Sequence, residues 1–341
     1  MKKGMKNTQI QGLRGICLIM VLTYHFCFRF FDIFSFEHFH FIVFDNMGSF
    51  AVTIFLFIST FYMFPKNKQK DFSYFGYLKR KLKRIWLPYA AAIVIIFSIV
   101  TMTDYPYNTT LKDFGFNLFF LQGIFRAEYV DGAHWYVTLL VFSIIIIGLL
   151  KKLRLADKWY VYCIWMALTA VLMKLKVPVV PNILGYSYVG IICAGMTISH
   201  LDGDLTRLKN EKLWIIPLVA SIGYTFFAFD YIWVIKMVLA AAISILAFNH
   251  KLGFLSFKPL VFIGDISYSV YLIHQFIGYA IMYELMLYFG EFYWWFPLVA
   301  LFAAFTLGII LYYSIENPIW MKSSRRRKNI EGQNNKTLGK E

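Results

Sequence analysis

The sequence predicts an all-α integral membrane protein, a bundle of about ten transmembrane helices with both termini in the cytoplasm. Three observations support this prediction. Apolar residues make up 59% of the 341 residues and charged residues only 16%, whereas soluble domains carry about 25% charged residues. Apolar segments of spanning length recur along the chain. Lys and Arg concentrate in alternate loops, as the topology of membrane proteins requires.

Ten apolar segments approach or reach the length of about 20 residues that a spanning helix needs. They are residues 10–31, 47–64, 85–103, 134–150, 159–177, 183–199, 213–229, 231–249, 260–282 and 296–316. The first is not a signal peptide, because Arg14 interrupts it and no small-residue cleavage site follows. Residues 114–125 are apolar but too short to span, so we expect them to lie at the interface or to re-enter.

The positive charge orients the bundle. With the N-terminus inside, 28 of the 34 Lys and Arg residues fall in the inside segments, and the outside segments hold only Lys112 and Arg126. The inside segments are 1–14, 65–84, 151–158, 200–212, 250–259 and 317–341. This arrangement accounts for most of the net charge of +15, so we expect no nucleic-acid partner. Residues 1–322 form a single transmembrane domain, and residues 323–341 a basic cytoplasmic tail that we expect to be disordered.

Two ionisable residues lie in the first helix, where a bilayer makes them costly. Arg14 and His25 are 11 residues apart, which is about three turns plus 20° and a rise of about 16 Å, so both project from one face. Arg14 lies near the cytoplasmic mouth and His25 deeper. The structural alternatives are an Arg14 that reaches the inner headgroups and a His25 that is a buried hydrogen-bonding residue.

The ninth predicted helix carries a second polar set, in GDISYSVYLIHQF. Ser267, Tyr271 and His274 follow at i, i+4 and i+7 on one face, and Tyr268 lies nearby. Hydrogen bonding between helices would explain these residues equally well.

A basic cluster stands at the foot of the third helix, in KRKLKRIWLPY, and includes Arg80, Lys81 and Arg84. It is either an anchor for the cytoplasmic side or an anion site for a phosphorylated ligand. Outside, GAHWYV places His134 and Trp135 where the fourth helix begins. The sequence contains no Walker loop, CxxC pair or HExxH motif, so no metal site and no permanently bound cofactor are expected.

Five segments together resemble the membrane acyltransferase 3 family. IQGLRGICLIMVLTYHF carries the Arg and His of the family's first helix as Arg14 and His25. The other four are GSFAVTIFLFIS, KRKLKRIWLPY, ISYSVYLIHQ and IENPIW, and all five occur in the family's order over about residues 9 to 320. Each motif alone is weak. The chain resembles a stand-alone member without a fused extracytoplasmic domain.

Three positions depart from the family pattern. Thr60 stands where a Gly is common, so the second helix is expected to pack differently. The basic Arg-x-x-Arg pair becomes Lys81-x-x-Arg84. Either phosphate binding there is looser, or Arg80 substitutes for the missing guanidinium. Leu140 stands near the Glu of one subgroup.

The resemblance implies an O-acyltransferase of a bacterial plasma membrane. It would move an acyl group, most often acetyl, from cytoplasmic acyl-CoA to a hydroxyl of an extracytoplasmic or lipid-linked glycan. His25 would then be the catalytic residue, as a general base or as a transient acyl carrier. The donor-binding residues would be Arg14, Arg80, Lys81 and Arg84, and the oxyanion or acceptor contacts Tyr268, Tyr271, His274, His134 and Trp135.

Other functions stay open at this point. A transporter or flippase for a glycan or small solute fits ten helices equally well, but carboxylates are scarce within the spans. A non-catalytic receptor or scaffold would tolerate substitution of His25. A different acyltransferase class that pairs His with Asn finds no convincing Asn inside the late helices, because Asn249 lies at a helix end.

Overall fold

The computed structural model describes residues 7–34, 42–63, 72–103, 105–106 and 109–319, and within these ranges every regular element is a helix. The first half of the bundle contains α1 (Thr8–Tyr24), α2 (Phe30–Phe34), α3 (Ile42–Met63), α4 (Tyr74–Val100), α5 (Leu111–Leu118), α6 (Gln122–Phe125) and α7 (Trp135–Lys152). The second half contains α8 (Trp159–Lys174), α9 (Val180–Leu184), α10 (Val189–His200), α11 (Ile215–Ala228), α12 (Tyr231–Phe248), α13 (Lys258–Phe289) and α14 (Phe296–Leu311).

Eight helical segments of the described chain are long and apolar enough to span a membrane. They correspond to eight of the ten predicted spans. The remaining two predicted spans, 159–177 and 213–229, coincide with the shorter apolar helices Trp159–Lys174 and Lys212–Ala228. The prediction of an all-α, multi-pass membrane bundle is therefore confirmed. The predicted tail, residues 323–341, lies outside the described residues.

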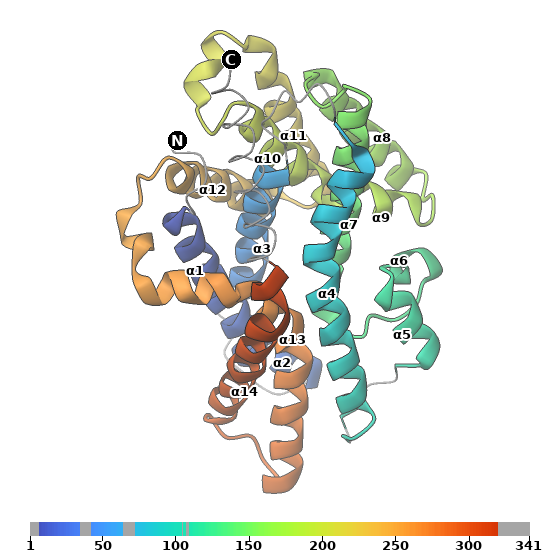
Figure 1. Cartoon of the computed structure of the whole chain (residues 1–341), viewed down its shortest axis with the longest axis vertical. Coiled ribbons are helices and arrows are strands. Elements are labelled where there is room, and N and C mark those ends of the chain that lie inside the picture. Colours follow the sequence, from blue (N-terminus) through green and yellow to red (C-terminus); the bar gives the residue numbers. More distant parts are fainter. Residues whose placement is uncertain (1–6, 35–41, 64–71, 104, 107–108, 320–341) are drawn as a thin grey trace, which may run out of the picture.

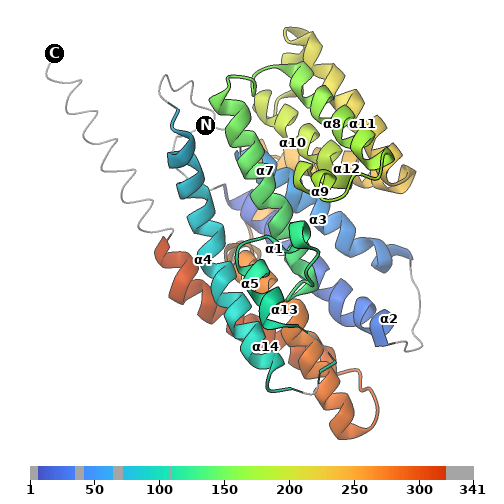
Figure 2. The same cartoon turned by 90° about the vertical axis from the view of Figure 1, so that its right-hand side faces the viewer.

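Helix α1 packs against α13 and against α3 (Figure 1). Its first turn is capped by Asn7, whose side-chain oxygen accepts hydrogen bonds from the backbone N–H groups of Gln9 and Ile10. On another side of the molecule, α8, α10 and α11 pack against one another, away from the α13–α14 hairpin (Figure 2).

Glycines allow α1 and α13 to approach each other closely. A Cβ atom on Gly15 would collide with the carbonyl oxygen of Leu260, and one on Gly264 would collide with that of Gln11. Small residues at such contacts are the usual means by which membrane helices bring their backbones together. The consequence is that side chains further along α1 and α13 also meet.

The short apolar segment predicted to lie at the interface or to re-enter forms α5 and α6, alongside α4. The indole N–H of Trp86 donates to the carbonyl of Leu118 at 2.9 Å, and the hydroxyl of Tyr89 to that of Asn117 at 3.1 Å. Both donors lie near the middle of α4. The start of α5 is fixed by Asp113, whose pKa is held below its usual value mainly by the hydrogen bond from the Thr110 hydroxyl.

Thr60, at the position where Gly is common in the family that the sequence resembles, packs against α10. Its side chain is fully buried and its hydroxyl donates to the carbonyl of Leu56 at 2.8 Å. It faces Gly195 of α10, where an added Cβ would collide with the Thr60 hydroxyl. The missing side chain on α10 therefore makes the room that the larger residue on α3 requires.

Candidate active site

His25 begins a π-helical turn, His25–Arg29, that follows α1 directly. Helix α1 is regular up to Tyr24, and His25 itself keeps helical backbone angles. The spacing argument for Arg14 and His25 therefore holds in the structure, and both side chains project from the same face. Single π-helical turns within α-helices occur frequently at functional sites.

His25 meets α13 at two residues. Its Nδ1 lies 2.9 Å from the hydroxyl of Tyr279. Its ring packs edge-to-face on the ring of His274, with 4.9 Å between the ring centroids. The sequence placed His274 on the polar face of this helix but did not predict which helix it faces, and the close contact between α1 and α13 supplies that partner.

The hydrogen bonds of His274 define which of its nitrogens carries the proton. Nδ1 lies 2.7 Å from the carbonyl oxygen of Tyr271, and because a carbonyl only accepts, Nδ1 must be the donor. Nε2 of the neutral ring then keeps its lone pair. This atom is buried and has no hydrogen-bond partner among the described residues. An unused acceptor beside His25 is unusual in a buried site.

The loop before α7 clamps α13 beside His274. His134 Nε2 lies 2.8 Å from the carbonyl of Leu272, and Asp131 accepts a hydrogen bond from the backbone N–H of Phe276 at 3.0 Å. These two backbone groups are four residues apart and would ordinarily bond to each other within the helix. The loop thus supplies a hydrogen-bond partner for the carbonyl of Leu272 and for the N–H of Phe276, the backbone groups that flank His274.

Asp131 also holds its own loop, because its other carboxylate oxygen accepts from the N–H of Ala133 at 2.8 Å. The side chains of Asp131 and His134 are both almost completely buried. His134 Nδ1 has no hydrogen-bond partner within the described part of the chain. The structure therefore brings His134 to the site, in contact with the backbone of α13 rather than with His25.

Aromatic side chains connect the two ends of the predicted site. Tyr136 packs edge-to-face on Tyr271 with 5.7 Å between centroids, and Tyr271 lies against His274 at 5.3 Å. The guanidinium of Arg14 interacts electrostatically with the hydroxyl of Tyr136, which in turn lies 3.1 Å from the hydroxyl of Ser59. A series of ring contacts therefore leads from Tyr136 to His25, and at its other end the charge of Arg14 acts on the hydroxyl of Tyr136.

Two predicted oxyanion contacts have other roles in the structure. The hydroxyl of Tyr271 donates to the carbonyl of Ala133 at 2.7 Å, and that of Tyr268 to the carbonyl of Ile85 at 2.8 Å. Both hydrogens are committed to backbone carbonyls, and His274 presents a lone pair rather than an N–H. These three side chains are thus poorly suited to donate to an oxyanion.

The basic cluster of α4 lies near Arg14 but is more open than the histidine pair. The ammonium group of Lys81 donates to the carbonyl of Tyr62 at 3.0 Å, and the hydroxyl of Tyr62 interacts electrostatically with Arg14. Arg84 is half-buried and Arg80 is exposed. The structure therefore brings Lys81 and Arg14 to the same end of α3.

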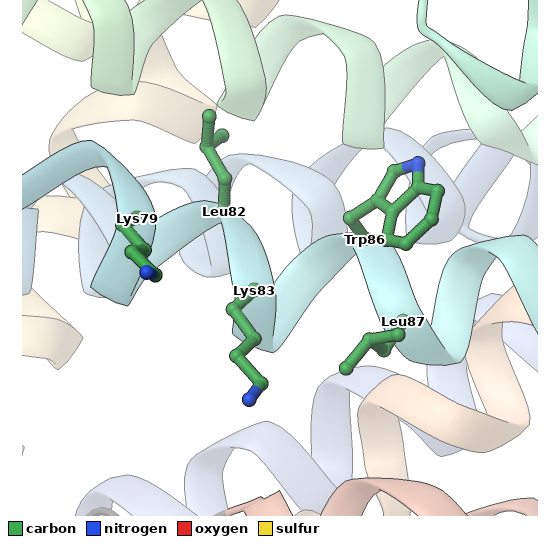
Figure 3. Close-up of a pocket in the computed structure, with 5 residues that line it drawn as sticks. All are labelled: Lys79, Leu82, Lys83, Trp86 and Leu87. Atoms are coloured by element: carbon green, nitrogen blue, oxygen red, sulfur yellow. The ribbon is translucent and has the colours of Figure 1, made fainter. Parts of the chain in front are cut away.

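A shallow hollow of about 380 Å³ lies on the same part of α4 (Figure 3). It is lined by Lys79, Leu82, Lys83, Trp86 and Leu87, and Lys83 and Leu87 point to the same side of the helix. Lys79 and Lys83 belong to the basic cluster predicted from the sequence, whereas Arg80, Lys81 and Arg84 do not line the hollow. The hollow combines an apolar surface with the ammonium groups of these two lysines.

Sequence reasoning missed two residues of this site. Tyr279 lies on α13 outside the face defined by the polar spacing, and only the contact with α1 reveals it. Asp131 precedes the predicted GAHWYV segment. It could not be recognised from the sequence, because a carboxylate that accepts hydrogen bonds from backbone N–H groups belongs to no sequence motif. Within the described ranges, no cluster of three or more His, Cys, Asp or Glu side chains could hold a metal ion.

Comparison with known proteins gives a match to one family model. The family model of an acyltransferase domain matches residues 7–313, which is nearly the whole chain and includes every residue of the site described above. Comparison with curated proteins and with solved structures gives no match. The matched model covers well over half of the sequence, and the chain therefore belongs to the acyltransferase 3 family of multi-pass membrane acyltransferases.

Proposed function

We propose that this membrane acyltransferase moves an acyl group, acetyl in the simplest case, from cytoplasmic acyl-CoA to a hydroxyl of an extracytoplasmic or lipid-linked glycan. The observation that carries the proposal is the pairing of His25 with His274, 4.9 Å between ring centroids, on the helix face that also bears Arg14. The protein would work in the plasma membrane of a bacterium, with both termini in the cytoplasm.

The donor would enter at the end of the bundle where Arg14 and the basic cluster of α4 lie. Coenzyme A carries several phosphate groups, which guanidinium and ammonium groups bind well. Arg14, Arg80, Lys81 and Arg84 would hold them. The adjoining hollow on α4 offers an apolar surface for the rest of the nucleotide. His25 lies about 16 Å along the helix from Arg14, a distance that the extended pantetheine arm can cross.

The chemistry would take place at His25. When Nδ1 donates to Tyr279, Nε2 holds a lone pair and can take the proton of the acceptor hydroxyl. The hydroxyl oxygen then attacks the thioester carbonyl carbon, the carbon–sulfur bond breaks, and His25 returns the proton to the thiolate. The products are the glycan ester and free CoA. A transient acyl-histidine at the same nitrogen would give the same balance.

His274 would act beside His25 rather than in its place. Its Nε2 lone pair can accept a hydrogen bond from the incoming hydroxyl or from protonated His25. Two imidazolium rings at this distance would repel each other, so the pair would take up at most one proton beyond the N–H that each neutral ring carries. In this arrangement the N–H of protonated His25 supports the oxyanion, since the tyrosine hydroxyls near His274 are engaged elsewhere.

The test compares surface glycans of the native host that carries the wild-type protein, a deletion, or His25→Ala at equal membrane abundance. Base-labile acyl esters are measured by mass spectrometry. We expect one ester to disappear from both the deletion and the variant, and its mass names the acyl group. His250→Asn is the matched control, because His250 is exposed with a positive φ of 58° that Asn tolerates.

Each other outcome has a definite meaning. Loss of the ester only in the deletion would remove His25 from the mechanism while keeping the reaction. An unchanged ester pattern in every glycan fraction would overturn the proposal that the acceptor is a glycan.

A further inference from the structure

A cavity of about 190 Å³ lies between the start of α7, the loop after α6 and the turn that follows α9. Five of its twelve lining residues are aromatic, and its polar groups come from tyrosine, tryptophan, threonine and asparagine side chains. The residues that give it this character are Tyr129, Trp135, Thr138, Asn182, Tyr186 and Tyr188. It is smaller than the pockets of about 300–1,000 Å³ that hold drug-sized ligands, and is of the size of a single small ring.

The three walls of the cavity belong to the same side of the membrane. In the topology proposed above, residues 123–129, 135–142 and 182–188 all lie at the extracytoplasmic end of their helices. That is the side on which a glycan acceptor would arrive. None of the lining side chains carries a carboxylate, an ammonium or a guanidinium group. The cavity is therefore suited to an uncharged ligand.

The chemistry of the walls matches a sugar ring. Pyranose rings present C–H groups on their faces and hydroxyls at their edges, so they bind flat aromatic surfaces flanked by hydrogen-bonding groups. Trp135 stacks on Tyr188 with 4.9 Å between centroids, which fixes one wall. Tyr186 remains 47% exposed although its backbone is fixed, because its carbonyl accepts a hydrogen bond from Tyr224 at 2.7 Å.

The polar floor of the cavity is formed by Thr138, which is hydrogen-bonded to Gln122, a residue outside the cavity lining. The hydroxyl of Thr138 accepts from the amide group of Gln122 at 2.7 Å. Gln122 is 1% exposed, and its amide oxygen has no hydrogen-bond partner among the described residues. A buried acceptor without a partner is costly, and this one belongs to the residue that is hydrogen-bonded to the cavity floor at Thr138.

Hydrogen bonds link the floor of the cavity to the active site. The hydroxyl of Thr138 donates to the carbonyl of His134 at 3.3 Å, and His134 Nε2 donates to the carbonyl of Leu272 at 2.8 Å. Leu272 is two residues before His274 on α13. Trp135 lines the cavity while its neighbour Tyr136 packs against Tyr271. The cavity therefore adjoins the histidine pair without containing it.

We propose that this cavity binds one uncharged pyranose ring of the acceptor, the ring next to the one that is acylated. The inference rests on the proposed function and adds to it a specificity site for the acceptor. Trp135 and Tyr186 would supply the stacking surfaces, and Asn182 and Tyr129 the hydrogen bonds to ring hydroxyls.

The test measures sugar binding directly, by saturation-transfer NMR on the full-length protein in nanodiscs. The probes are methyl glucoside, methyl galactoside and methyl N-acetylglucosaminide, with methyl glucuronide as the anionic comparison. We expect at least one neutral glycoside to bind the wild type more strongly than the glucuronide does. Trp135→Leu and Tyr186→Asn should each lower that signal about fivefold or more. Asn is chosen because Tyr186 has a φ of 44°.

Two controls separate the cavity from the reaction. Tyr288→Ala removes an aromatic residue that is 83% exposed and outside the cavity, and His25→Ala removes the proposed base, so both should leave binding unchanged. No binding of a neutral glycoside, or binding that survives both cavity variants, overturns the inference. If the glycan ester persists in the host while the cavity variants bind normally, only the subsite fails. If glycosides bind but no ester forms in the wild type, the proposed reaction fails.

Discussion

The two ends of the predicted site are built in different ways. His25 is itself half-buried, but the side chains that it contacts on α13 are fully buried, and hydrogen bonds from three separate parts of the chain fix this region. Around Arg14 and the start of α4 the charged side chains are less buried: Arg14 and Arg84 are half-buried, and Arg80 is exposed. The side chains of the first region are held in one arrangement. The second region only has to supply positive charge, which its long side chains could do in several conformations.

This difference teaches where substitutions should have large effects. A group fixed in a buried site acts through its position, so its loss cannot be compensated by neighbours. Charges in a partly exposed cluster share their task and are screened by solvent. We therefore expect substitutions in the histidine pair to affect activity most, those in the loop that clamps α13 less, and those in the basic cluster least.

The largest effect is expected from His25→Gln. Gln can still hydrogen-bond to Tyr279, but it cannot take a proton, so kcat for CoA release from acyl-CoA with acceptor should fall about 10²–10⁴-fold. The Kd for acyl-CoA should stay within a factor of about two, because Arg14 and the basic cluster are intact. A variant with normal kcat would show that the pair is structural.

Asp131→Ala should have the next largest effect, through position rather than chemistry. The substitution leaves the backbone N–H groups of Ala133 and Phe276 without their acceptor, at a cost of about 1–3 kcal/mol in the free energy of unfolding. We expect a lower thermal unfolding temperature in detergent together with a lower kcat. Asp131→Asn keeps one acceptor and should recover part of both. If stability falls while kcat of the folded fraction is unchanged, the loop does not position His274.

Tyr279→Phe tests the contact that orients His25. Its hydroxyl makes one hydrogen bond to Nδ1 at 2.9 Å, and one such bond contributes about 0.5–1.5 kcal/mol, so kcat should fall roughly 2- to 10-fold. KM for acyl-CoA should not change. The matched control is Tyr283→Phe, on the same helix. Equal effects of the two substitutions would contradict a specific role for Tyr279.

Much of the fold and part of the site could be predicted from the sequence. Hydropathy predicted the bundle, because lipid demands apolar length, and the spacing of Arg14 and His25 predicted their common face, because α1 is regular between them. The partner of His25 depends on the contact of Gly15 and Gly264 with a distant helix, which local periodicity does not contain. The clamp by Asp131 likewise depends on contacts with residues more than a hundred positions away.

The smallest effect is expected at the open end of the site. Arg80→Ala removes one exposed charge from a cluster that also contains Lys81 and Arg84, so KM for acyl-CoA should rise only about two- to fivefold at low salt, with kcat unchanged. The difference should shrink as salt is raised, because the Debye length falls from about 30 Å at 0.01 M to about 8 Å at 0.15 M. Lys209→Ala, an exposed charge on the same predicted side, is the control and should leave KM unchanged. A loss in kcat that salt does not affect would mean that Arg80 holds one fixed geometry, and the two ends of the site would then be alike.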